Sequence, residues 1–285
     1  MAEASSITAA MVTLVAETHI HVGVGQSTSA LDLPVAREKT THFPFIPGSG
    51  VKGAYRVWYT EKAKGADCKL LFGQSSGEDA GNDGGAGALL CSDARLMLLP
   101  VRCLSDAYKW VTCPAILRRL ARDCTRAGFG ALNWSPPVPE GRHFFGAGAT
   151  GDWLGLEERE FECAGAIDAS VITALTAFVG PEMAQDMAKR LVIISDTDFT
   201  WFAQYALPVM ARNSLDENKI SDGGLWYEET MAPDTILYAL FGERKPGVVK
   251  KFSDAIATAP YVQMGGNETI GQGWFKMVPY AGDRS

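Results

Sequence analysis

Glycine and basic side chains are concentrated in residues 43–56, FPFIPGSGVKGAYR, in a pattern suited to binding an anion. The pattern predicts a short strand, a glycine turn and a helix over residues 51–64, with Ser49 as its N-cap. Backbone N–H groups at a helix N-terminus lack intrahelical partners and carry the positive end of the helix dipole. Lys52 and Arg56 lie four residues apart, and therefore on one face of this helix. The stretch is a candidate phosphate site.

The phosphate could belong to a nucleotide or to a nucleic-acid backbone. Residues 48–53, GSGVKG, lack the spacing and the final Ser or Thr of a P-loop. Gly48, Gly50 and Gly53 match a dinucleotide-binding G-x-G-x-x-G, but no βαβ crossover with an acidic residue at the required distance follows them. A nucleotide-dependent enzyme is therefore one alternative. A tight strand-to-helix turn without any ligand is another.

Asp32 lies in a polar, proline-containing connection predicted over residues 25–42. Irregular connections of this length are uncommon in compact domains unless they serve a function. An exposed aspartate is ionised at neutral pH and is a poor general base, but it is a good ligand for Mg²⁺, which favours one or two carboxylates with phosphate oxygens and waters. The alternative is a turn or capping residue.

His19 and His21 belong to residues 11–24, whose alternating pattern predicts a strand. An imidazole can act as a general acid or base, whereas a histidine between apolar neighbours on a strand is commonly structural. Both roles stay open for His21. The H-x-H spacing would place the two rings on one face, yet no third metal ligand is evident nearby in the sequence.

A hairpin is predicted where two β-like segments flank a polar turn at residues 216–224 that ends in Gly-Gly. At its base, Trp226 and Tyr227 could stack on nucleic-acid bases or could pack against the protein. Glu228 and Glu229 follow them directly and could assist a reaction there.

Near the C-terminus, four glycines would let the backbone approach a ligand closely or would form a tight hairpin, and both readings can hold. They are Gly265, Gly266, Gly271 and Gly273.

Charge is sorted along the chain. The formal net charge of −7 argues against indiscriminate nucleic-acid binding, which depends mainly on Lys and Arg, but it leaves room for a local basic groove. One basic group comprises Arg37, Lys39, Lys52 and Arg56. A second comprises Arg118, Arg119, Arg122 and Arg126, on a predicted amphipathic helix whose arginines are most simply a solvated face.

Composition is ordinary for a globular protein, with 47% hydrophobic and 21% charged residues in 285. The six cysteines form no C-x-x-C pair, which predicts free thiols in a reducing cytoplasm and neither zinc nor disulfides. No apolar run is long enough to span a membrane, and no basic segment precedes an apolar one at the N-terminus. We therefore expect no membrane partner.

Strands and helices are expected to interleave without the regular alternation of a parallel sheet, so the predicted fold class is α+β. Strands are expected at residues 88–99, 156–163, 191–195, 235–241, 261–264 and 274–278, and helices at residues 115–126, 172–180, 182–191, 199–205 and 247–257. Residues 133–151 and the acidic, glycine-rich residues 73–87 have no periodicity and are expected to be irregular.

Four ordered segments resemble the RAMP superfamily of CRISPR effector proteins. Residues 46–56, IPGSGVKGAYR, are similar to its I-P-G-S-[SG]-[LV]-K-G-x-x-R signature, and residues 18–25, THIHVGVG, to its T-x-L-H-V-G-x-G. Residues 32–38, DLPVARE, and 262–273, VQMGGNETIGQG, resemble segments of the repeated backbone subunit of type III-B (Cmr) complexes. The equivalent type III-A subunit is less similar in these two segments. Residues 73–87 have no counterpart that we can place.

The resemblance implies one RAMP domain over residues 1–285, with a ferredoxin-like, RRM-type core and large insertions. The core, or palm, would take residues 8–64, 88–100, 160–195 and 235–280; the insertions would take residues 65–87 and 101–160. Residues 196–234 would form a protruding β-hairpin thumb that lies over the guide RNA and interrupts its pairing with the target at regular intervals.

The resemblance also implies a function: binding of CRISPR guide RNA and cleavage of complementary target RNA at regular intervals. Asp32 would be catalytic and would hold Mg²⁺ or another divalent cation such as Mn²⁺, with His21 and Glu228 as further catalytic candidates. A 2′-hydroxyl would attack the adjacent phosphate in line and give a cyclic phosphate. The expected partners are the two RNAs, other copies of this chain in a filament, and the large, small and guide-end-capping Cmr subunits.

RNA contacts are expected from the phosphate-site residues Gly48, Ser49, Gly50, Lys52, Gly53 and Arg56 and from the C-terminal glycines Gly265, Gly266, Gly271 and Gly273. Arg37 and Tyr227 are further expected RNA contacts. The main alternative is a guide-binding scaffold of the same fold without nuclease activity. The nucleotide-dependent enzyme is a third hypothesis.

Overall fold

A computed structural model describes residues 9–25, 31–64, 66–74, 85–132, 134–147, 151–221 and 223–282 of the chain. The fold is a mixed α+β arrangement built on one large sheet, which confirms the predicted class. No helix within these residues is long and apolar enough to cross a membrane.

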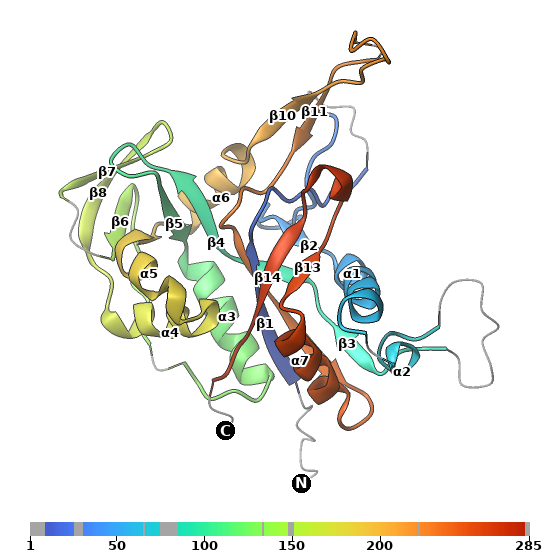
Figure 1. The fold of residues 1–285 in the computed structure, drawn as a ribbon. Coiled ribbons are helices and arrows are strands. Elements are labelled where there is room, and N and C mark those ends of the chain that lie inside the picture. The colour runs from blue at the N-terminus through green and yellow to red at the C-terminus, as the bar shows by residue number, and fades with distance from the viewer. Residues whose placement is uncertain are drawn as a thin grey trace.

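Four antiparallel strands form the centre of the sheet, in the order β14-β1-β12-β4. Along the chain, helix α1 comes after β1, and helix α7 connects β12 to the last strands (Figure 1). This β-α-β-β-α-β order is that of a ferredoxin-like core. The elements are β1 (Ala9–Ala16), α1 (Gly48–Glu61), β4 (Ala94–Arg102), β12 (Ile236–Glu243), α7 (Val248–Thr258) and β14 (Trp274–Pro279).

Both faces of the central sheet are covered, because all eight residues of β1 are buried. Side chains alternate across a strand, so the two faces belong to different clusters. Val12 and Leu14 pack in the cluster that contains α1 and α7. Met11 packs on the other face, in the cluster formed by α3 (Pro114–Arg126), α4 (Ala169–Val179) and α5 (Ala184–Arg190).

The remaining elements extend this core. The sheet continues through short strands: β2 (Phe45–Ile46), β3 (Leu89–Cys91), β5 (Tyr108–Thr112), β6 (His143–Gly146), β7 (Trp153–Leu156), β8 (Arg159–Ala166), β9 (Leu191–Ile193) and β13 (Tyr261–Gln263). The other helices are α2 (Cys68–Phe72), η1 (Pro181–Met183), α6 (Asp196–Tyr205) and η2 (Glu268–Ile270).

A separate two-stranded sheet, β10 (Val209–Arg212) with β11 (Trp226–Glu229), projects from one end of the body (Figure 1). The hairpin predicted around residues 216–224 is thus present. The proposed division of the chain into palm, insertions and thumb stays a prediction.

Several predicted boundaries are wrong. The strand expected over residues 11–24 ends at Ala16, so His19 and His21 lie beyond it, where Ile20 forms only an isolated bridge. Residues 88–99 form two strands, and residues 133–151, expected to be irregular, contain β6. In each case pairing with a strand that is distant in the sequence decides where the strand begins and ends, and the local residue pattern does not indicate that pairing.

Ser49 is not the helix N-cap. Helix α1 begins at Gly48, one residue before Ser49. Pro47 is in the cap position and makes no side-chain capping bond. The six cysteines are free thiols, as predicted. Residues 75–84 of the acidic loop lie outside the described residues.

An aromatic cluster fixes both core helices to the sheet, which generates a prediction about stability. The ring of Phe252 lies 5.0 Å from that of Tyr55 on α1 and 4.5 Å from that of Phe241 on β12, and Phe252 is fully buried. We expect Phe252→Ala to lower the free energy of unfolding by about 3–5 kcal/mol, because it leaves a cavity. Denaturant unfolding followed by circular dichroism measures this loss.

The control is Lys250→Ala on the same helix, whose side chain is 78% exposed and pairs with Asp254 at the surface. That change should alter stability by less than about 0.5 kcal/mol. A loss below about 1 kcal/mol for Phe252→Ala would mean that the cluster does not hold α7.

Candidate active site

Four segments, two from the first 40 residues and two from the last 60, meet at the base of the hairpin (Figure 1). They are residues 17–25, residues 31–38, strand β11 and the glycine loop at residues 264–273. Their contacts are mainly backbone hydrogen bonds: Ile20 exchanges two with Met231, and the N–H groups of Gly266 and Gly273 donate to the carbonyls of His21 and His19. Three of the four segments used to infer the family are thus in direct contact.

Asp32 lies at the edge of the hairpin, and its side chain is held there. Its Oδ2 accepts a hydrogen bond of 2.8 Å from the backbone N–H of Tyr227. The next residue, Leu33, forms a parallel bridge to β11: its N–H donates to the Tyr227 carbonyl, and its own carbonyl accepts from Glu229 N–H. The carboxylate is half-buried, and Oδ1 has no hydrogen-bond partner among the described residues.

Glu229 anchors the loop that carries Asp32. Its carboxylate accepts two hydrogen bonds of 2.6 Å from the Arg37 guanidinium and one of 3.0 Å from Val35 N–H. Glu229 is only 3% exposed. Charge-assisted, bidentate pairs of this kind are geometrically specific. Arg37 also donates twice to the Ala203 carbonyl, so the structure uses this side chain within the chain, and its predicted RNA contact stays a prediction.

The ring of His21 is oriented by the same residue. Its Nδ1 lies 2.8 Å from the Glu229 carbonyl oxygen. A carbonyl only accepts, so Nδ1 carries a proton, and in the neutral ring Nε2 has the lone pair. Gly23 leaves room for this nitrogen, because a Cβ at Gly23 would lie 2.7 Å from Nε2. The arrangement supplies an oriented base as well as a structural contact.

Glu228 is buried beneath the site, 3% exposed, and is not available at its surface. Its Oε1 accepts from the side-chain amide of Asn267, and its Oε2 lies 3.3 Å from Arg212 Nε. Its Oε1 is also 3.8 Å from His21 Nδ1. Glu228 thus connects hairpin, glycine loop and histidine. Sequence reasoning missed Arg212, whose only signal was a charge within a predicted strand.

His19 does not join His21 as a metal pair. Its Nδ1 lies 3.1 Å from Thr230 Oγ1. Burial, reinforced by the charge of Arg212, lowers the pKa of His19 below its usual value, so the ring is neutral at pH 7. Within the part of the chain that the structure describes, no three His, Cys, Asp or Glu side chains are grouped to hold a metal.

One backbone N–H group at the N-terminus of α1 is already hydrogen-bonded within the chain. The Gly48 N–H donates to Asp93 Oδ1 at 2.7 Å. A Cβ at Gly48 would lie 3.2 Å from backbone atoms of Cys91 and Ser92, so this glycine serves close packing. Ser49 is exposed on the first turn.

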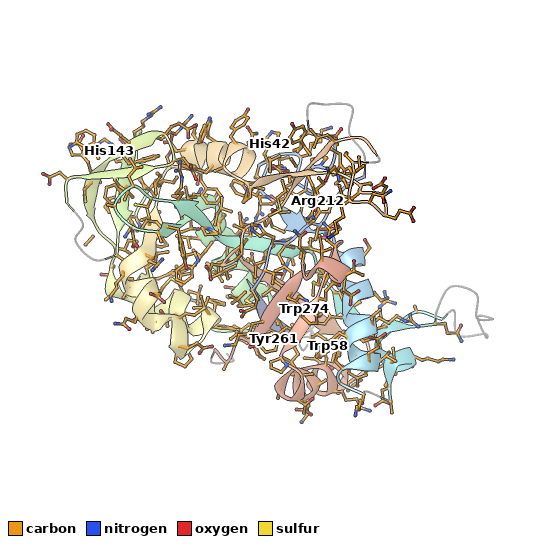
Figure 2. All side chains as sticks on the ribbon, turned by 45° about the horizontal axis from the view of Figure 1, so that its top comes forward. His42, Trp58, His143, Arg212, Tyr261 and Trp274 are labelled. Atoms are coloured by element: carbon orange, nitrogen blue, oxygen red, sulfur yellow. The ribbon has the colours of Figure 1, made fainter. Side chains whose placement is uncertain are left out.

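Gly50 and Gly53 instead line a groove of about 290 Å³ between α1 and the glycine loop. Its other side includes Tyr261, Trp274 and Gly265; Figure 2 labels Trp58, Tyr261 and Trp274 close together. A Cβ at Gly53 would meet nothing within 4 Å. Glycine inside a helix costs about 1 kcal/mol relative to alanine, and the chain's own packing gives no reason for it here.

Lys52 and Arg56 point to a different side of α1 from the groove. Arg56 donates to the Gln74 carbonyl at 3.1 Å. Lys52 lies near Cys91. Burial raises the pKa of the Cys91 thiol to about 12, and the positive charge of Lys52 opposes this rise. These contacts place both side chains beside α2 and β3 and not at the hairpin base, so the predicted site residues fall into two groups.

The glycines of the C-terminal loop also divide into two kinds. Gly265 and Gly273 have positive φ, and a Cβ on either would lie within 2.5 Å of a backbone oxygen, of His21 and Met264 respectively. These two are required by the fold. Gly271 has open space around it, although its φ of +81° also favours glycine, and Gly266 has ordinary room. Tyr227 is 41% exposed, whereas Trp226 is half-buried.

Known proteins resemble this chain over nearly its full length. It is 31% identical to the CRISPR system Cmr endoribonuclease Cmr4 of Pyrococcus furiosus, with 92% of each chain covered. A crystal structure of oligomeric Cmr4 from that organism superposes with a TM-score of 0.75 at 26% identity, covering 96% of this chain and 98% of the other. Another Cmr4 crystal structure gives a TM-score of 0.73 at 25% identity, covering 96% and 100%.

A chain in a cryo-EM structure of type III-B Cmr-beta bound to cognate target RNA shares the fold, with a TM-score of 0.72 at 20% identity over 95% of this chain and 97% of the other. The family model of the RAMP superfamily matches residues 13–276, a range that includes all four segments that resembled it. The chain therefore belongs to the RAMP superfamily.

Proposed function

We propose that this chain is the repeating backbone subunit of a type III-B CRISPR ribonucleoprotein, which binds guide RNA and cleaves complementary target RNA at regular intervals. The observation that carries the proposal is Asp32, held at the hairpin base by Tyr227 N–H in a chain similar to the Cmr endoribonuclease. That relative is an endoribonuclease by name, and the similarity to it extends over 92% of the chain.

Guide RNA would contact the groove beside α1. Gly50 and Gly53 leave its floor open to close approach by a phosphate backbone, and Tyr261 offers a 47% exposed ring for stacking. Lys52 and Arg56 add positive charge on the adjacent face of the helix.

Asp32 fits a divalent cation only in part. One carboxylate oxygen is taken by Tyr227 N–H, which leaves Oδ1 as the donor. Mg²⁺ accepts one or two carboxylates and completes its shell with phosphate oxygens and waters, so a site of this kind would form with RNA bound. When bound there, Mg²⁺ or Mn²⁺ would offset charge on the scissile phosphate. Asp32 would be the residue that holds such a cation.

The cleavage step needs a proton acceptor. The 2′-hydroxyl oxygen would attack the adjacent phosphorus, the bond to the 5′-oxygen would break, and a 2′,3′-cyclic phosphate would form. His21 Nε2 would accept the hydroxyl proton, because the other ring nitrogen, Nδ1, already carries a proton and donates it in a hydrogen bond to the Glu229 carbonyl. The leaving 5′-oxygen would be protonated from solvent. Glu228 would act by orienting His21 from below.

The proposed assembly is a cytoplasmic filament of copies of this chain with the large, small and guide-end-capping Cmr subunits. Oligomeric Cmr4 is a precedent for self-association in the family. The alternative is a scaffold that binds guide RNA without cutting the target. Comparing RNA cleavage by the wild type and by an Asp32 variant distinguishes the nuclease from the scaffold.

Asp32→Asn should abolish cutting and spare binding. Asparagine keeps an oxygen for Tyr227 N–H but removes the charge, so we expect the cleavage rate to fall at least about 100-fold. The measurement is cleavage of labelled complementary RNA by the reconstituted complex, with and without Mg²⁺, beside guide-RNA affinity.

Asp168→Asn is the matched control, since that exposed carboxylate also accepts one backbone N–H, from Ser170. It should cut at the wild-type rate. Regular cutting by Asp32→Asn would reject Asp32 as the catalytic residue. No cutting by the wild type, with tight guide binding, would favour the scaffold.

His21→Asn tests the proposed base. The asparagine amide can still donate to the Glu229 carbonyl, but no group replaces Nε2. We expect the rate to fall about 10²–10⁴-fold, because the asparagine cannot accept the hydroxyl proton. A fall below tenfold would leave His21 a structural residue.

Arg37→Ala tests how the catalytic loop is anchored. It leaves the buried carboxylate of Glu229 without its cation, so we expect unfolding to become easier by about 3–5 kcal/mol. Arg102→Ala breaks a pair whose arginine is 69% exposed and should cost less than about 1 kcal/mol. Denaturant unfolding measures both. Loss of guide-RNA affinity in Arg37→Ala at unchanged stability would instead make Arg37 an RNA contact.

A further inference from the structure

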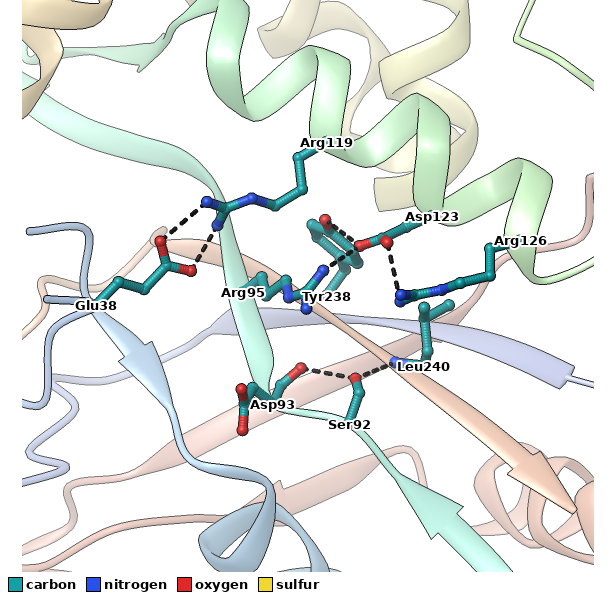
Figure 3. A network of polar contacts seen from close by, with 9 residues as sticks. All are labelled: Glu38, Ser92, Asp93, Arg95, Arg119, Asp123, Arg126, Tyr238 and Leu240. Carbon is teal, nitrogen blue, oxygen red and sulfur yellow. Dashed lines mark hydrogen bonds and ion pairs between the residues drawn. The ribbon is translucent and has the colours of Figure 1, made fainter. Parts of the chain in front are cut away.

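A second basic surface lies away from the hairpin, in a groove of about 560 Å³. Four arginines and two carboxylates line it: Arg95, Arg119, Arg122, Arg126, Glu38 and Asp123. The lining has two more positive than negative charges, in a chain whose formal net charge is −7. Figure 3 shows Arg119 and Arg126 reaching this region from α3, and Arg95 reaching it from β4.

Both carboxylates are already compensated inside the chain. Asp123 is 4% exposed and accepts from Arg95 at 2.7 Å and from the Tyr238 hydroxyl at 2.9 Å, and its other oxygen lies 3.0 Å from Arg126. Glu38 accepts from Arg119 through both oxygens, at 2.5 and 3.0 Å. The surplus positive charge is therefore not needed to neutralise these acids.

Arg122 contributes one of these two surplus positive charges. It is exposed, and no hydrogen bond or ion pair joins it to any residue in the described ranges. It lies three residues after Arg119 and four before Arg126, so the three side chains share one face of α3. Like charges at this spacing destabilise a helix, and an anion placed between them would remove the repulsion.

We propose that this groove binds the phosphate backbone of an RNA strand. Planar guanidinium groups match phosphate oxygens in pairs, and the groove presents several of them around one space. Such contacts hold a strand without reading its bases, as an enzyme guided by base pairing requires. The inference rests on the proposed function for its RNA ligand and for the site of cutting at Asp32.

The catalytic loop connects this groove to Asp32. Glu38, which Arg119 holds in the groove, lies six residues after Asp32. Six residues of extended chain span at most about 22 Å. A bound strand of several nucleotides can therefore contact both places, and the groove would guide RNA towards or away from the site of cutting.

Two substitutions at Arg122 test the proposal. The side chain is exposed and has no described partner, so Arg122→Gln and Arg122→Glu should fold normally. The control is Arg118→Gln, which removes the same charge from the same helix at an arginine that pairs with Asp196 outside the groove. Fluorescence anisotropy of labelled RNA would be measured over a salt series, with the chain and guide RNA in one arm, and with the guide-loaded complex and target RNA in the other.

We expect Arg122→Gln to weaken binding about tenfold in one arm, and Arg122→Glu to weaken it further. The slope of log affinity against log salt should fall by about 0.7 for the lost phosphate contact, equally for unrelated RNA sequences. Arg118→Gln should change the affinity less than twofold. Loss in the first arm assigns the groove to the guide, and loss in the second assigns it to the target.

Wild-type affinity and salt slope in both Arg122 variants would overturn the inference and leave the proposed function intact. Reduced self-association in sedimentation velocity, with RNA binding unchanged, would also overturn it, because the groove would then contact protein. Failure of the wild type to bind any RNA would instead reject the proposed function itself.

Discussion

The candidate active site depends on one buried glutamate. Glu229 binds the Arg37 guanidinium and Val35 N–H with its carboxylate, the Leu33 carbonyl with its N–H, and His21 Nδ1 with its carbonyl. A carboxylate taken out of water is costly unless it is paired and hydrogen-bonded, and here every contact also positions a neighbouring segment. The contacts of Glu229 thus orient the catalytic loop and His21 together.

The glycine loop connects the two groups of predicted functional residues. Gly265 packs directly against the His21 carbonyl, and it also lines the groove beside α1. On the other side of the loop, Asn267 binds Glu228 beneath the hairpin. One short, tightly bent segment is therefore a wall of the proposed guide groove and a support of the proposed cutting site. A guide bound in the groove would press on the same backbone that fixes His21.

The hairpin combines an ordered base with an apolar, exposed outer part. Glu228 and Glu229 are buried where it meets the body, whereas Leu215, Ile220 and Leu225 are 57%, 65% and 61% exposed. Several exposed apolar side chains on one projection are costly for an isolated chain and mark a surface for contact. In the proposed filament that contact would be made with RNA bases or neighbouring subunits.

Local pattern by itself determined the class of the fold, the amphipathic helix of α3, the hairpin, the free cysteines and the four segments that reveal the family, because periodicity, turn residues and short motifs are written in neighbouring residues. It did not determine that the first strand stops at Ala16, that Asp93 occupies the start of α1, or that Arg212 and Asn267 converge on Glu228. Those facts arise from hydrogen bonds and one ion pair between residues from 16 to more than 200 positions apart. Only the tertiary structure decides them, since it alone brings buried charges within reach of partners that satisfy them.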